Sequence, residues 1–273
     1  METLRLREMR ELAAASWEVY RDAIEFGIGA LVRPSIPILF FGDDERYAST
    51  ARKVITVGLN PSRLEFPNVD PFLRFPAARQ IDPQRPALDQ HLAALRAYFR
   101  ERPYNAWFRP AFEPILNGLA ASYYQGAANT ALHTDICSPL ATDPTWSRLG
   151  SVGAQLTAAG VELWHRLVEQ LAPDVILISV ARRHLGMIRF PKLGVWETIH
   201  LIERKNPFMV QALRVEVVPQ KPTLLVFGRA ANLPFGTVSA ADKRTIGEAI
   251  GTALDACSAA VRAVHASWRR TPA

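Results

Sequence analysis

Cysteine is scarce in this chain of 273 residues, and apolar runs of membrane-spanning length are absent. Its two cysteines, Cys137 and Cys257, lack a Cys-x-x-Cys partner or a histidine at metal-binding spacing. The sequence therefore predicts neither a disulfide framework nor a metal centre, and we expect both cysteines in the core. The apolar runs, such as 175–180 and 223–227, are far shorter than the roughly 20 residues that cross a membrane. No membrane-spanning segment is expected.

A signal peptide is also missing from the N-terminus. The region that would have to be apolar is interrupted by Arg5, Arg7, Glu8, Arg10 and Glu11. We therefore expect a cytoplasmic protein, and 49% hydrophobic with 21% charged residues is typical of a soluble globular chain. The net charge of +6 permits a phosphate-bearing partner without requiring one.

Three motifs that identify common α/β proteins do not occur. The chain contains no Gly-x-Gly-x-x-Gly and no Gly-x-x-x-x-Gly-Lys, which excludes a dinucleotide fingerprint and a P-loop. It also lacks Gly-x-Ser-x-Gly, which argues against the serine hydrolases that are most common on this architecture.

Four apolar segments at 53–57, 129–135, 174–180 and 223–227 are typical of buried strands. Helical segments separate the first three, and a crossover through a helix joins parallel strands. We therefore predict an α/β fold: a three-layer α/β/α sandwich around a central, mainly parallel sheet of four strands.

Other segments complete a single domain that spans residues 1–273. Residues 1–50 read as an N-terminal helical extension, and Ser239 caps a C-terminal helix over 239–271. Helical periodicity also predicts helices over 87–102, 107–124 and 151–171. A β-hairpin is expected over 195–218, with its turn at 204–207. Segment 62–86 contains five prolines together with apolar side chains, so we expect an ordered lid over the end of the first core strand.

Polar residues follow each predicted core strand. Asn60 follows the first, Asp135 ends the second, 182–184 follows the third, and 229–232 follows the fourth. If the fourth strand is parallel as well, these residues meet at one sheet edge, where open α/β sheets bind ligands. Gly58-Leu59-Asn60-Pro61-Ser62 also fits an ordinary turn, since asparagine and proline are common turn residues. The coincidence of polar residues at several strand ends favours a functional role.

This five-residue stretch resembles the first signature of the uracil-DNA glycosylase superfamily. The closest branches are the mismatch-specific and single-strand-selective ones, in which Gly-x-Asn-Pro-Gly follows the first core strand. The resemblance implies that Asn60 positions the attacking water, while Gly58, Leu59, Pro61 and Ser62 contact the substrate. Ser62 replaces the usual glycine.

The same resemblance implies further substrate contacts. An aromatic residue about a dozen positions downstream stacks on the flipped base in the family, and Phe72 fits that spacing, with Phe75 as the rival. Where the family reads the uracil edge with an asparagine, this chain has Asp135 or Thr134. Asn232 stands at the position of the second signature and would act with Asn60 in catalysis, with Arg229 supplying positive charge nearby.

The implied function is hydrolysis of the N-glycosidic bond of uracil, or of a related deaminated base, in DNA. We expect a monomer that binds DNA and uses no cofactor or metal. Two alternatives remain open. One is a non-catalytic protein of the same fold that binds damaged DNA or abasic sites, and the other is a small-molecule hydrolase or nucleotide-binding α/β protein that shares only the turn.

Overall fold

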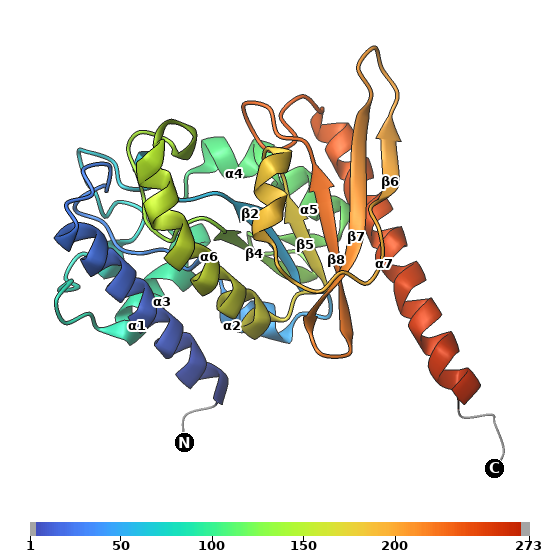
Figure 1. The fold of residues 1–273 in the computed structure, drawn as a ribbon, viewed down its shortest axis with the longest axis horizontal. Helices are drawn as coiled ribbons and strands as arrows, with labels where there is room; N and C mark the ends of the chain where they lie inside the picture. The colour runs from blue at the N-terminus through green and yellow to red at the C-terminus, as the bar shows by residue number, and fades with distance from the viewer. Residues whose placement is uncertain (1–3, 269–273) are drawn as a thin grey trace.

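The computed structural model describes residues 4–268, with side chains for residues 4–256, and shows a mixed α/β fold around a central sheet (Figure 1). Four neighbouring strands form the parallel part of the sheet, in the order β4-β2-β5-β8. They are β2 (Val54–Gly58), β4 (Asn129–Asp135), β5 (Val175–Ile178) and β8 (Lys221–Gly228). The four predicted strands and their parallel direction are therefore confirmed.

The sheet has eight strands, so the predicted number of four is wrong. The additional strands are β1 (Phe40–Phe41), β3 (Ala121–Ser122), β6 (Glu197–Ile202) and β7 (Phe208–Val218). β1 and β3 have only two residues each, too few to produce a recognisable pattern. The predicted hairpin exists as β6 and β7, and it extends the sheet because β7 pairs antiparallel with β8.

Helices cover both faces of the sheet, as the alternating side chains of β4 show. Thr134 faces α6 (Ser151–Leu171), where Trp164 Nε1 donates to its hydroxyl at 3.1 Å. His133 faces the other side, with its ring centroid 5.3 Å from that of Phe108. This second side carries α4 (Asn105–Ala111) and α5 (Glu113–Gly118), against which α7 (Ala240–Trp268) packs. Figure 1 shows α6 in front of the sheet and α5 and α7 behind it.

The N-terminal segment, predicted as a helical extension, begins with a helix that packs into the core. In α1 (Leu4–Glu25), Trp17 is fully buried and its Nε1 donates to His91 of α3 (Leu88–Ala97) at 3.2 Å. β1 then pairs with β4 in the sheet. Burial of a tryptophan and pairing of a strand both stabilise the domain directly.

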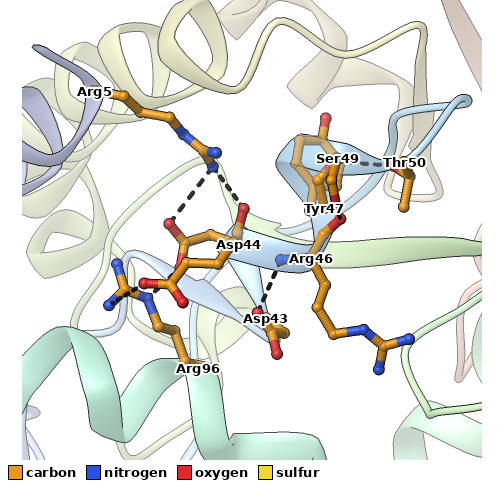
Figure 2. A network of polar contacts seen from close by, with 9 residues as sticks. Arg5, Asp43, Asp44, Arg46, Tyr47, Ser49, Thr50 and Arg96 are labelled. Carbon is orange, nitrogen blue, oxygen red and sulfur yellow. Dashed lines mark hydrogen bonds and ion pairs between the residues drawn. The ribbon is translucent and has the colours of Figure 1, made fainter. Parts of the chain in front are cut away.

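A buried carboxylate joins three of these N-terminal elements (Figure 2). Asp44 of α2 (Asp44–Ser49) is 2% exposed, and its Oδ1 accepts from Arg96 Nε of α3 at 2.6 Å. Arg5 of α1 approaches the same carboxylate at 3.6 Å and donates to the Asp44 carbonyl at 2.6 Å. Asp43 caps α2, whereas the side chain of Arg46 points away from this network.

Proline changes one predicted helix. The segment 107–124 does not form one helix: α4 ends at Ala111, α5 ends at Gly118, and the predicted last turn is not helical because Ala121–Ser122 form β3. Pro110 and Pro114 remove backbone donors that a continuous helix would need. The other predicted helices are present, with α3 followed by the 3₁₀ turn η3 (Tyr98–Arg100). Ser239 caps α7 as expected, since Asp242 N donates to its hydroxyl at 3.1 Å. Residues 269–271 of the predicted C-terminal helix and the side chain of Cys257 lie outside the described residues.

Cys137 is fully buried, as predicted. Between residues 4 and 268, no helix has both the length and the apolar character that crossing a membrane requires.

Candidate functional site

The carboxyl ends of the four parallel strands lie along one edge of the sheet, which we call the carboxyl edge. β2 ends at Gly58 and β4 ends at Asp135, and these two residues are paired in register. β5 ends at Ile178 and β8 at Gly228, and these strands are also parallel. The polar segments that follow the four strands therefore begin from the same edge, as the sequence predicted.

The side chain of Asn60 is held in one orientation. Its Nδ2 donates to the carbonyl oxygens of Pro61 at 2.7 Å and Leu140 at 3.2 Å, and lies 2.9 Å from Thr142 Oγ1. Turning the amide over would place Oδ1 against two carbonyl oxygens, so these contacts determine which atom is nitrogen. Asn60 is partly exposed, and Oδ1 has no hydrogen-bond partner in the described part of the chain. This oxygen can accept a hydrogen bond from a bound water.

The backbone around Asn60 is clamped to the segment that follows β4. Cys137 N donates to Leu59 O at 2.8 Å, and Thr142 N donates to Pro61 O at 3.2 Å. Pro61 is buried, while Gly58 and Leu59 are partly exposed. The turn therefore presents a rigid backbone and one free amide oxygen at the carboxyl edge.

Ser62 fits this turn without strain. Its φ of −104° is open to any residue, so the position does not require glycine. Its hydroxyl accepts from Leu64 N at 3.2 Å and caps η1 (Arg63–Glu65), the first 3₁₀ turn of the lid. The serine of this chain therefore has a local structural role.

The Asp135 side chain lies directly beside Gly58. A Cβ atom on residue 58 would lie 2.4 Å from Asp135 Oδ1 and 3.1 Å from His133 Nε2. His133 Nε2 lies 3.6 Å from the same carboxylate oxygen, and both side chains are nearly buried. Any larger residue at position 58 would therefore require the Asp135 carboxylate to move from its observed position.

A buried chain of hydrogen bonds orients His133. Its Nδ1 lies 2.7 Å from Thr56 Oγ1, which also bonds to the Tyr123 hydroxyl. Burial raises the pKa of Tyr123 well above its usual value, so this phenol keeps its proton and can donate to Thr56. Thr56 can then donate to His133, because its other acceptor, Leu132 O, is 3.5 Å away. With the donors in this order, His133 carries its proton on Nε2, the ring nitrogen that lies nearest the Asp135 carboxylate; the opposite order would place the proton on Nδ1.

A second carboxyl group, Glu65, lies in the lid and is only 5% exposed. Tyr98 donates to its Oε2 at 2.5 Å, and Arg74 Nε lies 3.9 Å from the same oxygen. Burial raises the pKa of Glu65 to about 7, against the lowering effects of Tyr98 and Arg74, and the charge of Asp135 adds to the increase. Glu65 can therefore exchange a proton near neutral pH.

Of the two candidate stacking aromatics, only Phe72 is accessible. Phe75 is fully buried and stacks on Phe66 with ring centroids 5.4 Å apart, so it has no free face for a ligand. Phe72 is partly exposed and meets Phe66 edge-on at 6.5 Å. The lid is ordered as expected, and its buried phenylalanines anchor it to the core.

Of the two candidate edge readers, only Asp135 faces the Gly58 side. Thr134 is fully buried on the opposite face of the sheet, where it accepts from Trp164 and lies 3.3 Å from Thr56 O. Its hydroxyl is thus used inside the protein.

The segment after β8 presents its polar residues to solvent. Arg229 and Asn232 are exposed, and neither side chain makes a hydrogen bond or ion pair within the described residues, with Asn60 or with any other group. The segment is anchored by Phe235, which fills the space beside Gly228 and lies 6.2 Å from the Phe112 ring. Asn232 follows the end of β8 by four residues, but its side chain forms no hydrogen bond with Asn60, Asp135 or Glu65.

Three side chains of the site had no assigned role in the sequence: Thr56, Tyr123 and Glu65. His133 is buried and its Nδ1 is hydrogen-bonded inside the protein. Its spacing of two residues from Asp135 on a strand was a usable signal, since such residues share a face. Glu65 is the acidic residue between Leu64 and Phe66, but its burial could not be known from the sequence.

Together, these residues offer an amide oxygen, a carboxylate and a carboxyl that is half-neutral near pH 7, all able to bind water or N–H groups. Within the described residues, no three His, Cys, Asp or Glu side chains are grouped as metal ligands. Comparison of the chain with models of protein families, with curated proteins and with solved structures found no match.

Proposed function

We propose that this protein is a DNA glycosylase of the uracil-DNA glycosylase superfamily, closest to its mismatch-specific and single-strand-selective branches. On this proposal it hydrolyses the N-glycosidic bond of uracil, or of a related deaminated base, in base excision repair. The observation that carries the proposal is the Asn60 amide. Its nitrogen is held by Leu140 and Thr142, and its oxygen has no partner among the described residues, in the turn that follows the carboxyl edge at Gly58.

The base has to leave the DNA stack before it can be cut out. A base inside a duplex is unreachable, so the enzyme flips the nucleotide and reads the base in a pocket. Phe72, with part of its ring exposed at the lid, stacks on the flipped base. Stacking on an aromatic side chain contributes ~1–3 kcal/mol per base.

Asp135 and Glu65 recognise the polar edge of the base. The Asp135 carboxylate accepts the N–H proton between the two carbonyls of uracil but repels the carbonyl oxygens. A donor is needed beside it, and Glu65 supplies one in its neutral form. The protonated carboxyl of Glu65 and the Nε2–H of His133 thus complement the acceptor Asp135.

The chemical step breaks the bond between the sugar C1′ and the base nitrogen. The base leaves with the electron pair, and the sugar passes through an oxocarbenium-like state. A water whose hydrogen is bound by Asn60 Oδ1 directs its lone pair at C1′ and forms the new C–O bond. The water gives up one proton to solvent, and the base anion takes one up. Asn60 orients the water and accepts no proton itself.

A second candidate function is favoured by one observation. Asn232 and Arg229 are exposed, and among the described residues they form no hydrogen bond or ion pair with Asn60, Asp135 or Glu65. A protein of this fold without the help of Asn232 in catalysis would bind damaged DNA or abasic sites without cutting the glycosidic bond. Arg229 would then serve binding alone.

The test is an excision assay on a panel of oligonucleotides. Single-stranded and duplex DNA would carry uracil, hypoxanthine, xanthine or no lesion, and alkali would cleave any abasic site that forms. The proposal expects cleavage of at least one deaminated base and none of the control. Tight binding of lesion or abasic DNA without release of any free base would support the non-catalytic alternative and overturn the catalytic one.

A further inference from the structure

The β6–β7 hairpin projects past the carboxyl edge. Val210 of β7 pairs with Gly228, the last residue of β8, so Phe208 and Met209 extend β7 further by ~7 Å. The turn over residues 203–207 lies beyond them. Figure 1 shows the hairpin rising past the end of β8. Because β2, β5 and β8 are parallel, the Asn60 turn leaves the sheet from the same edge.

Cationic side chains gather around this hairpin. Five exposed residues form what we call the hairpin surface: Arg182, Arg183, Arg204, Lys205 and Arg229. None of the five forms an ion pair with another described residue. Glu203 is the acidic residue of the turn, so positive charge is in clear excess here.

Two of these arginines are fixed by neighbouring side chains. Arg182 donates to Gln211 of β7 and lies 4.9 Å from the centroid of the Phe227 ring. Arg204 donates to Thr237 Oγ1 at 2.9 Å and also to the Thr237 carbonyl, which ties the hairpin turn to the segment after β8. Fixed guanidinium groups lose less conformational entropy when they bind an anion.

The other three cations, Arg183, Lys205 and Arg229, have no hydrogen-bond partner among the described residues. The hairpin also carries an exposed apolar pair: Leu201 and Met209 are directly opposite in its register and are 45% and 53% exposed. Free cations beside a small apolar patch match the alternating phosphates and sugars of a nucleic-acid strand. On a surface that only faces solvent, cations are commonly balanced by nearby carboxylates, which would leave no excess of positive charge.

We infer that the hairpin surface binds the phosphate backbone of DNA on one side of the target base. The choice of DNA as the polyanion rests on the proposed function. The distance from β2 to β7 is three strand spacings, or ~14 Å. Phosphates along one strand of a duplex are ~3.4 Å apart, so the hairpin would meet the backbone about four nucleotides from the flipped base.

A second copy of this chain fits the surface less well, because the same positive charges would face one another. An acidic protein partner would share the charge complementarity but would gain nothing from DNA length. Only binding to DNA is expected to depend on the length of the DNA, and this dependence can be measured.

The test compares two double variants of the full chain. Arg183→Ala/Lys205→Ala removes two free cations from the hairpin surface and leaves Asn60, Asp135, Glu65 and Phe72 unchanged. The matched control, Arg46→Ala/Arg166→Ala, removes two exposed cations from α2 and α6. Arg46 precedes the start of β2, and Arg166 lies toward the end of α6 that leads into β5, so both are far from the carboxyl edge.

Affinity for an undamaged duplex is measured by fluorescence anisotropy across a range of salt concentrations. We expect the hairpin variant to bind at least about fivefold more weakly at low salt, with its salt slope reduced by about two, while the control matches wild type. In a duplex that carries a lesion, removing DNA beyond about four nucleotides on one side of the lesion should weaken binding by wild type but not by the hairpin variant. Equal affinities and slopes for both variants would overturn the inference.

The inference and the proposed function fail separately. Reduced DNA affinity of the hairpin variant, with no base excision by wild type, would retain the surface and reject the catalytic proposal. Normal excision by wild type with unchanged DNA binding by the hairpin variant would retain the catalytic proposal and reject the hairpin surface.

Discussion

Gly58 and Asp135 meet at the ends of two paired parallel strands, so closely that a Cβ atom on residue 58 would lie 2.4 Å from Asp135 Oδ1. The backbone of Gly58 is not in a left-handed conformation, so the turn itself does not demand glycine there. The neighbouring Asp135 carboxylate is the reason for glycine at this position, because a larger side chain would require that carboxylate to move. This contact links the Asn60 turn to the residue that we assign to base recognition.

Replacing Gly58 with alanine is therefore expected to displace Asp135. Overpacking of this kind costs about 1–3 kcal/mol of unfolding free energy, which urea denaturation would measure. Gly186→Ala is the matched control, because a Cβ atom there would meet nothing within 4 Å. Equal stability of the two variants would contradict the close contact.

Glu65 is expected to make stability depend on pH. Its pKa is raised from 4.5 to about 7 in the folded protein, so the folded state holds this proton more tightly than the unfolded state. The tighter proton binding by Glu65 contributes at most about 3 kcal/mol to the free energy of unfolding. This contribution is fully present below pH ~4.5 and is lost as pH rises through about 7.

Glu65→Gln tests this because glutamine cannot ionise but can still accept from Tyr98. We expect urea denaturation at pH 5 and pH 8 to show a smaller fall in stability for Glu65→Gln than for wild type. An identical fall in both proteins would mean that Glu65 is not the group responsible.

Tyr47 is expected to tolerate loss of its hydroxyl. This oxygen is buried and has no hydrogen-bond partner among the described residues, near the Asp44 network of Figure 2. Tyr47→Phe should leave stability unchanged or raise it by about 1 kcal/mol. Tyr98→Phe is the contrast, because its hydroxyl serves both Glu65 and the Tyr104 backbone, and we expect a loss of about 2 kcal/mol. A Tyr47→Phe loss as large as that of Tyr98→Phe would refute the assignment.

Asp135 is expected to limit the preference for uracil. An asparagine at this position can accept the uracil N–H proton and also donate to a carbonyl, whereas a carboxylate can only accept. Asp135→Asn should therefore raise the excision rate of uracil relative to the other bases by about 10-fold, the value of one added hydrogen bond. Asp135→Ala serves as control. If the asparagine and alanine variants have the same base preference, residue 135 does not read the base.

The main strands were predictable because each is a short apolar run that ends at a polar or glycine-containing turn. The two-residue strands β1 and β3 were not, since two residues carry no periodicity. In the lid, the sequence spacing could not distinguish Phe72 from Phe75 as the stacking residue. Only the packing of the folded protein shows that Phe75 is buried.

The sequence identified Asn60 but could not orient it. The groups that hold its amide, Leu140 and Thr142, lie about eighty residues away along the chain. The His133 tautomer and the raised pKa of Glu65 likewise depend on contacts between distant segments. Such properties come from the folded environment, which a local motif does not contain.

The central claim is that Asn60 positions the water that attacks C1′. Its most direct test is the single-turnover excision rate of wild type and Asn60→Ala on a uracil-containing oligonucleotide, at protein concentrations that saturate the DNA. We predict excision by wild type and a rate at least about 100-fold lower for Asn60→Ala, with DNA affinity changed less than about threefold. No uracil release by wild type, or equal rates for the two proteins, would contradict the claim.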